Sequence, residues 1–334
     1  MKFLQLPDNE KIELINQLHE ENNLQQVIIE KDEWVTAVLR ALFSLPYAEH
    51  LSFKGGTSLS KCWKLIERFS EDIDVAVNRE YLGFTGELSK TQINDKLRRA
   101  ACSFVREKLQ IDIAKALENQ GISTDLFSVK VNITSVTTTD PEIVEIEYKS
   151  LFTASDYIKR KVVVEVGGRS MSEPLETVKL QSIIDEAFPN AAFAEKSFNA
   201  QVVVPERTFL EKICLLHEEF AKPQELVRTE RMSRHLYDLE RMMNTDIAEK
   251  SLSNKDLYHS IVEHRRLFVG LRGFDYSMLA PQTIKIVPPE SVINLWKKDY
   301  ETMQRTMIYG ESLQFNELIE RIKHLNERLN RMDW

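Results

Sequence analysis

The chain has 334 residues, of which 43% are hydrophobic, so it is long enough for more than one domain and can bury a sizeable core. Its net charge of −8 argues against indiscriminate nucleic-acid binding, but it does not exclude a local basic surface. There is no apolar run of the length that a transmembrane helix needs, and the chain does not begin like a signal peptide. We therefore expect a cytoplasmic protein without a membrane span. The three cysteines lack metal-ligand spacing and are expected to be reduced core thiols.

Hydrophobic periodicity divides the chain into an α/β part and a helical part. Helical patterns are predicted at 9–44, 91–118, 205–220, 233–243 and over most of 291–334, and strands at 72–77, near 127–136, at 143–150, 162–166 and 201–204. We therefore predict an α/β domain with N-terminal helices over 1–200, followed by a helical domain over 201–334. The active cleft is expected to need both parts.

A glycine turn precedes a strand that carries two aspartates. Side chains alternate along a strand, so Asp72 and Asp74 share one face, while Ile73 and Val75 face the core. An isolated Asp-x-Asp is usually a solvated strand edge, and an isolated Gly-Gly is usually a turn. Together and in this order they indicate a phosphoryl-transfer site, because paired carboxylates suit Mg²⁺ with the remaining ligands supplied by water and phosphates.

The residues of the turn, 55–58, suit contact with a phosphate. Glycine allows close approach of main-chain N–H groups, so Gly55 and Gly56 are candidate nucleotide-binding residues. Thr57 or Ser58 is expected to cap the helix that follows, whose N-terminus favours an anion.

This combined pattern resembles a known family. Gly55-Gly56-Thr57-x-Leu59 followed by Arg68-x-Ser70-x-Asp72-Ile73-Asp74 is similar to the polymerase-beta-like nucleotidyltransferases, and most of all to their AbiEii/AbiGii toxin branch. The resemblance implies a palm with a mixed sheet, followed by a helical C-terminal domain. It also implies that Gly55, Gly56, Thr57 and Ser58 bind the nucleotide.

The same resemblance directs the search for a third carboxylate. In Lys161-Val-Val-Val-Glu165-Val-Gly-Gly-Arg169, alternation places Glu165 on the face opposite to Val162, Val164 and Val166. Glu165 is therefore the predicted third metal ligand, although a Glu in place of Asp departs from the family pattern and leaves its distance to the metal open. The alternative is an edge-strand glutamate that pairs with Lys161 or Arg169.

In the predicted helix 205–220, Phe209, Ile213, Leu216 and Phe220 form a buried stripe with Lys212 beside it. The resemblance implies that Lys212 contacts the nucleotide triphosphate. The alternative is an exposed helix lysine, but no carboxylate lies one helical turn from it in the sequence.

The segment that begins at Ser233 matches the last motif of the family. Arg234 and Asp238 are four residues apart, so they can form an ion pair with each other. Alternatively, Arg234 binds phosphate, and Asp238 orients the attacking hydroxyl or acts as its base.

These features favour a metal-dependent nucleotidyltransferase toxin of a toxin–antitoxin or phage-defence system. Asp72, Asp74 and Glu165 are expected to hold Mg²⁺ or Mn²⁺, and an NTP is the expected substrate. The family makes a tRNA 3′ end the leading acceptor and a separately encoded antitoxin the expected partner. The alternatives are transfer to a small molecule or a protein hydroxyl, or a non-catalytic nucleotide-binding module. The last needs neither both aspartates nor Lys212, which favours an enzyme.

Overall fold

A computed structural model describes residues 1–334 except 23, 71, 132–140, 154–158, 172 and 334. The chain forms two compact units. The first consists of Met1–Cys62 and Phe69–Val203, and the second of Trp63–Arg68 and Val204–Trp334. The main division lies at Val203 and Val204 rather than at 200 and 201, because residues up to Val203 complete a strand. The segment 63–68, which sequence analysis placed in the first domain, belongs to the second unit.

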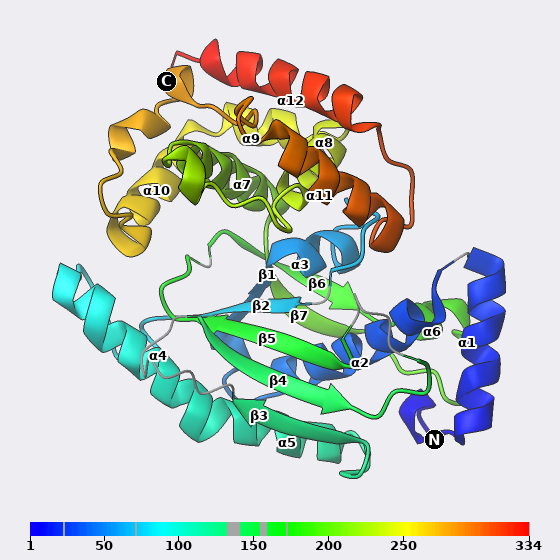
Figure 1. The fold of residues 1–334 in the computed structure, drawn as a ribbon. Coiled ribbons are helices and arrows are strands. Elements are labelled where there is room, and N and C mark those ends of the chain that lie inside the picture. The colour runs from blue at the N-terminus through cyan, green and yellow to red at the C-terminus, as the bar shows by residue number, and fades with distance from the viewer. Residues whose placement is uncertain (23, 71, 132–140, 154–158, 172, 334) are drawn as a thin grey trace. The chain divides into compact units, whose positions relative to one another are not determined.

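The described part of the first unit contains a seven-stranded sheet in the order β3-β4-β5-β2-β1-β7-β6. The strands are β1 (Leu51–Lys54), β2 (Asp72–Val77), β3 (Phe127–Val131), β4 (Glu142–Tyr148), β5 (Lys161–Gly167), β6 (Leu175–Leu180) and β7 (Phe198–Val203). β2 pairs with β5 in parallel, as does β1 with β7, and the remaining pairs are antiparallel. The predicted mixed sheet is therefore confirmed, with β2 and β5 in its middle (Figure 1).

Helices accompany this sheet. They are α1 (Asp8–Asn22), α2 (Gln26–Phe43), α3 (Gly55–Lys61), α4 (Arg98–Phe104), α5 (Gln110–Asn119) and α6 (Ile183–Ala187). α2 packs on β5 and β7, and α5 packs on β3 and α2 (Figure 1). The helix expected at 9–44 is two helices, and that expected at 91–118 contains two π-helical segments, Gln92–Leu97 and Val105–Leu109.

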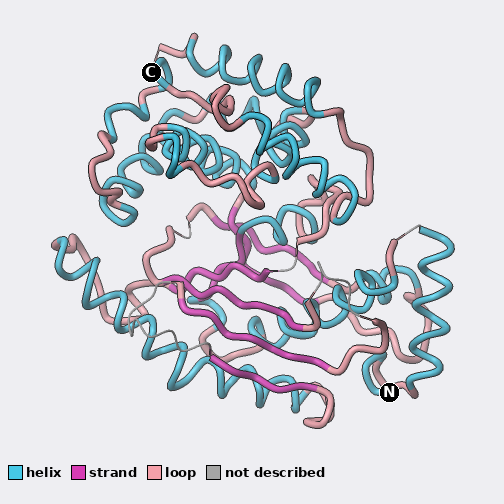
Figure 2. The backbone as a smooth tube through the Cα atoms, in the orientation of Figure 1, coloured by secondary structure: helices cyan, strands magenta, loops and turns pink. Residues whose placement is uncertain are grey.

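The second unit is helical, as predicted for the C-terminal part of the chain. Its α-helices are α7 (Pro205–Phe220), α8 (Arg234–Met243), α9 (Ile247–Ser253), α10 (Lys255–His264), α11 (Ile293–Thr306) and α12 (Phe315–Asn330). All the named strands lie in the first unit. In the second unit, Figure 2 shows helices and loops. Phe209, Ile213 and Leu216 are fully buried, which confirms most of the predicted stripe. No helix within the described ranges has the length and apolar character that crossing a membrane requires.

Candidate active site

Two acidic residues lie side by side in the middle of the sheet. Asp74 of β2 and Glu165 of β5 are register partners in a parallel pair, and Asp72 precedes Asp74 by two residues on the same face. Asp72, Asp74 and Glu165 are half-buried, whereas Ile73 and Val75 are buried. The predicted alternation is confirmed, and the parallel register brings Glu165 next to Asp74. We call Asp72, Asp74 and Glu165 the acidic row.

The surroundings of Glu165 argue against two parts of its alternative interpretation, an edge strand and a pair with Lys161. β5 lies between β4 and β2, so Glu165 is on an internal strand and not on an edge strand. The amine of Lys161 forms an ion pair with Glu145 of β4. Lys161 is thus engaged with another carboxylate at the start of the same strand.

Gly55 lies directly against the acidic row. It is the first residue of α3 and has a φ of +82°, in the left-handed region that glycine adopts readily. A Cβ at this position would overlap Oδ2 of Asp74 and lie 2.7 Å from its Cγ. The glycine turn and the acidic strand are therefore in contact, and this contact has no room for a side chain at position 55.

Thr57 and Ser58 do not cap α3. The helix begins at Gly55, so both residues lie inside it, and its N-cap residue, Lys54, makes no side-chain capping bond. The Thr57 hydroxyl donates to the main-chain oxygen of Asp72 at 2.5 Å, and the Ser58 hydroxyl donates to that of Gly55 at 2.9 Å. The capping prediction was wrong because the glycines start the helix instead of preceding it. The two buried hydroxyls hold the motif together.

The donor set of the acidic row fits a hard divalent cation. Within the described residues, no three or more His, Cys, Asp or Glu side chains are arranged as a preformed metal site. Mg²⁺, however, commonly uses one or two carboxylates and obtains its other ligands from water and substrate phosphates. Asp72 and Asp74 meet this requirement, and Glu165 lies beside Asp74 in register. A third ligand role for Glu165 stays a prediction.

The second unit contains a buried cluster of three charged residues. Arg68 donates to Asp238 through Nε to Oδ1 at 2.7 Å and through Nη2 to Oδ2 at 2.8 Å. Lys212 Nζ lies 2.9 Å from Asp238 Oδ2. The exposed fraction of the side chains is 3% for Arg68, 9% for Lys212 and 0% for Asp238. The structure thus brings two predicted site residues, Lys212 and Asp238, into direct contact.

Burial and ion pairing shift the pKa values of Asp238 and Lys212 in opposite directions. Burial raises the pKa of Asp238, but the charges and hydrogen bonds of Arg68 and Lys212 outweigh it and hold that pKa well below its usual value. For Lys212, burial lowers the pKa, and the nearby Asp238 only partly offsets this. Burial and the charge of Lys212 also hold the pKa of His235 well below its usual value, and His235 Nδ1 lies 3.4 Å from Lys212 Nζ. Asp238 is therefore a carboxylate at neutral pH, and it holds the amine of Lys212.

The segment that carries Arg68 is attached to α8 by further contacts. The N–H of Glu67 donates to the Tyr237 hydroxyl at 3.2 Å, and Arg241 forms an ion pair with Glu67 at 2.8 Å. Arg68 also forms an isolated antiparallel bridge with Ile308. These contacts position the guanidinium of Arg68 for its two bonds to Asp238.

Comparison with known proteins places this architecture in a family. Residues 37–321 match the family model described as nucleotidyl transferase AbiEii toxin, type IV toxin–antitoxin system. The chain belongs to the AbiEii family. Among curated proteins, nothing matches the chain.

Two solved structures are similar to this AbiEii protein over almost their whole length. The nucleotidyltransferase toxin MenT4 from Mycobacterium tuberculosis H37Rv is 14% identical, with a TM-score of 0.44, and the match covers 97% of this chain and 98% of MenT4. JHP933 from Helicobacter pylori is also 14% identical, with a TM-score of 0.35, and the match covers 92% of this chain and 100% of JHP933.

The sequence did not predict the contacts of two residues of this AbiEii protein, Arg68 and Lys54. Arg68 is part of the motif that carries the family resemblance, but its partner Asp238 lies 170 positions away. Lys54 directly precedes Gly55 and is the register partner of Asp74 on β1. Its position next to the glycine pair could have singled it out, but its strand was not predicted.

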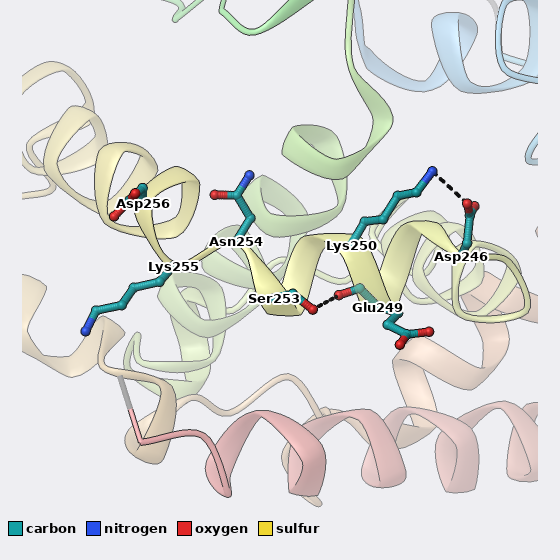
Figure 3. Close-up of a pocket in the computed structure, with 7 residues that line it drawn as sticks. All are labelled: Asp246, Glu249, Lys250, Ser253, Asn254, Lys255 and Asp256. Atoms are coloured by element: carbon teal, nitrogen blue, oxygen red, sulfur yellow. Dashed lines mark hydrogen bonds and ion pairs between the residues drawn. The ribbon is translucent and has the colours of Figure 1, made fainter.

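A surface hollow on the second unit offers no comparable chemistry. It is lined by Asp246, Glu249, Lys250, Ser253, Asn254, Lys255 and Asp256 (Figure 3). Lys250 pairs with Asp246, and Ser253 donates to the main-chain oxygen of Glu249. The Asn254 side chain accepts from the N–H of Leu257 and so caps α10. These groups serve the local structure of α9 and α10.

Proposed function

We propose that this AbiEii nucleotidyltransferase toxin transfers a nucleoside monophosphate from an NTP to the 3′ hydroxyl of a tRNA, and that the transfer requires Mg²⁺ or Mn²⁺. Family membership supports nucleotidyl transfer. The observation that carries the metal requirement is the register of Asp74 and Glu165, with Asp72 on the same face. A binding module would not need three carboxylates gathered on one face of a central sheet, where their charges repel each other.

The reaction joins the acceptor oxygen to the α-phosphorus of the NTP. The bond from that phosphorus to the oxygen that bridges to the β-phosphate breaks, pyrophosphate leaves, and the hydroxyl proton passes to solvent. A metal ion bound by Asp72 and Asp74 would neutralise charge on the phosphate oxygens and align them with the attacking hydroxyl. We assign the main-chain N–H groups next to Gly55 and Gly56 to phosphate contact, with Thr57 and Ser58 stabilising this turn. Glu165 is the proposed third ligand.

We assign two cationic residues of the second unit, Lys212 and Arg234, to the triphosphate, as the family resemblance implies for Lys212. Lys212 would keep its bond to Asp238 and donate its remaining protons to phosphate oxygens, and the guanidinium of Arg234 is a further phosphate donor. Of the two roles predicted for Asp238, that of a base is disfavoured, because a carboxylate with a strongly lowered pKa accepts a proton poorly. We assign Asp238 as a positioning residue that orients Lys212.

A labelling assay tests this function. The purified protein is incubated with Mg²⁺, total tRNA and each α-³²P-labelled NTP in turn, beside the double variant D72A/D74A. Label on tRNA with the wild type alone would support the proposal and identify the nucleotide. Label on a small molecule or on protein would show that the acceptor is not tRNA. Equal labelling by the wild type and by D72A/D74A would refute the catalytic assignment.

An antitoxin completes the proposed system, since the family is that of type IV toxin–antitoxin systems. Expression of the chain alone should stop growth of a host culture, whereas D72A/D74A should not. Co-expression of the separately encoded antitoxin should restore growth. Growth arrest by the double variant would show that toxicity does not depend on the acidic row.

A further inference from the structure

Lys54 extends the acidic row by one strand. It is the register partner of Asp74 across the antiparallel pair of β1 and β2, and opposed residues in such a pair share one face of the sheet. Three neighbouring strands therefore present Lys54, Asp74 and Glu165 in one line on the same face. The residue after Lys54 is Gly55, which lies against Asp74. All of these residues belong to the first unit.

The ammonium of Lys54 is directed to a neutral partner. Its Nζ donates to Ser170 Oγ at 3.1 Å, and among the described residues no carboxylate forms an ion pair with it. Two other lysines of this unit with low exposure pair with carboxylates: Lys61 with Asp32 at 2.6 Å, and Lys161 with Glu145. Lys54 is half-buried, so its unpaired charge is partly withdrawn from water at this face. A partly buried ammonium that has no carboxylate partner is suited to binding an anionic ligand.

Ser170 is held near Lys54 by the turn that follows β5. This turn begins at Gly168, where a Cβ would lie 2.8 Å from the Cβ of Ala101 in α4. The chain thus packs closely on α4 at Gly168, and two residues later Ser170 accepts the hydrogen bond of Lys54. The two side chains come from segments more than one hundred positions apart and so form a site that neither segment forms alone.

We propose that Lys54, positioned by Ser170, binds phosphate oxygens of the metal-bound nucleotide. The inference rests on the proposed function, because Asp72 and Asp74 must hold the metal that brings the phosphates to the row. A divalent cation held by carboxylates leaves excess negative charge on a triphosphate, and a neighbouring ammonium neutralises part of it. Lys54 would thus be a phosphate-binding residue in the first unit, independent of Lys212 in the second.

Binding measurements on the intact protein test this assignment without turnover. Calorimetry would measure the affinity for inorganic tripolyphosphate with Mg²⁺, which requires no knowledge of the base, and electron paramagnetic resonance would measure binding of Mn²⁺ alone. K54M should weaken tripolyphosphate binding about tenfold or more, which is the loss of affinity expected when one charge-assisted hydrogen bond is removed. Because Lys54 is not a metal ligand in this proposal, K54M should leave Mn²⁺ binding intact. K54R should keep most of the affinity.

A control variant, K179M, and a second variant, S170A, test whether the effect is specific to Lys54 and its partner. Lys179 is an exposed lysine on β6, the edge strand of the same sheet, so K179M removes the same charge far from the row. K179M should bind tripolyphosphate like the wild type, and S170A should weaken binding less than K54M does. Equal affinities of K54M and wild type would overturn the inference. Failure of the wild type to bind would also overturn it, and the labelling assay would then decide separately whether the nucleotidyltransferase proposal stands.

Discussion

Gly55 and Asp74 fit together so closely that position 55 has no room for a Cβ: such an atom would overlap Oδ2 of Asp74 and lie 2.7 Å from its Cγ. Gly55 also has a φ of +82°, which other residues rarely adopt. Two separate physical constraints therefore require glycine here. They explain why the glycine turn and the aspartate strand occur together, because the turn forms one wall around the Asp74 carboxylate.

G55A should lower both stability and metal affinity. The left-handed conformation alone costs a non-glycine residue roughly 1–2 kcal/mol, and displacement of Asp74 adds to this cost. Gly83 provides the matched control, because its φ is +87° but nothing lies within 4 Å of its Cβ position. G83A should therefore lose stability without a change in Mn²⁺ affinity. Urea denaturation and Mn²⁺ titration measure both quantities, and an unchanged Mn²⁺ affinity in G55A would show that the contact with Asp74 is unimportant.

Removal of the carboxylate from the buried cluster should be strongly destabilising. D238A leaves the guanidinium of Arg68 and the amine of Lys212 buried without their counter-ion, which typically costs about 3–5 kcal/mol. D246A is the control, because it breaks an exposed pair with Lys250 and should have no measurable effect on the urea midpoint.

D238N separates the two roles of Asp238. The amide keeps the shape of the side chain but removes the charge that holds both cations, so a positioning role predicts a loss of stability together with triphosphate affinity. A role as base alone predicts loss of the transfer rate with stability and tripolyphosphate affinity retained. Chemical denaturation, calorimetry and the labelling assay distinguish these results.

T57V should weaken the link between α3 and β2. The hydroxyl of Thr57 donates to the main-chain oxygen of Asp72, and its loss should cost about 1–2 kcal/mol. The control is T36V, because the buried hydroxyl of Thr36 donates to the main-chain oxygen of Asp32 inside a single helix. T36V should lower stability alone, whereas T57V should also reduce Mn²⁺ affinity. An equal Mn²⁺ affinity in the two variants would show that the link does not position the acidic row.

The features that local spacing encodes were predictable from the sequence. The alternation of Asp72 and Asp74 with Ile73 and Val75 follows from the period of a strand, and the buried stripe of α7 follows from the period of a helix. The pairing of strands has no such local signal, so the register of Lys54 with Asp74 was not predictable. The carboxylate partner of Lys212 likewise comes from another helix, where intrahelical spacing gives no information.

A buried carboxyl in the first unit should make stability depend on pH. Glu33 of α2 is 5% exposed, and its Oε2 has no hydrogen-bond partner among the described residues. Burial raises its pKa from 4.5 to about 8, which the neighbouring Asp185, Asp32 and Glu195 reinforce and the Ser182 hydroxyl partly opposes. Lys61 pairs with Asp32, and Lys2 and Arg40 pair with Glu195, so nearby cations are engaged with other acids.

The sign of the pH dependence follows from where the proton is held. Below pH 4.5 the carboxyl is protonated in both folded and unfolded chains, and its contribution to stability is fully present. Between this pH and about 8 the folded chain keeps a proton that the unfolded chain has lost, so stability falls by about 1.4 kcal/mol per pH unit. The loss is complete once the pH passes the folded pKa. E33Q, which is neutral throughout, should therefore gain stability relative to wild type as the pH rises.

Urea denaturation of E33Q and wild type at several pH values between 5 and 8.5 measures this difference. All other titrating groups are shared, so the change in the difference isolates Glu33. E147Q is the control, because Glu147 lies on the exposed side of β4 and its pKa is lowered by its hydrogen bond and ion pair with Lys130. The difference for E147Q should not turn in favour of the variant as pH rises. A flat difference for E33Q would mean that Glu33 is ionised in the folded chain and has a counter-ion or water beside it.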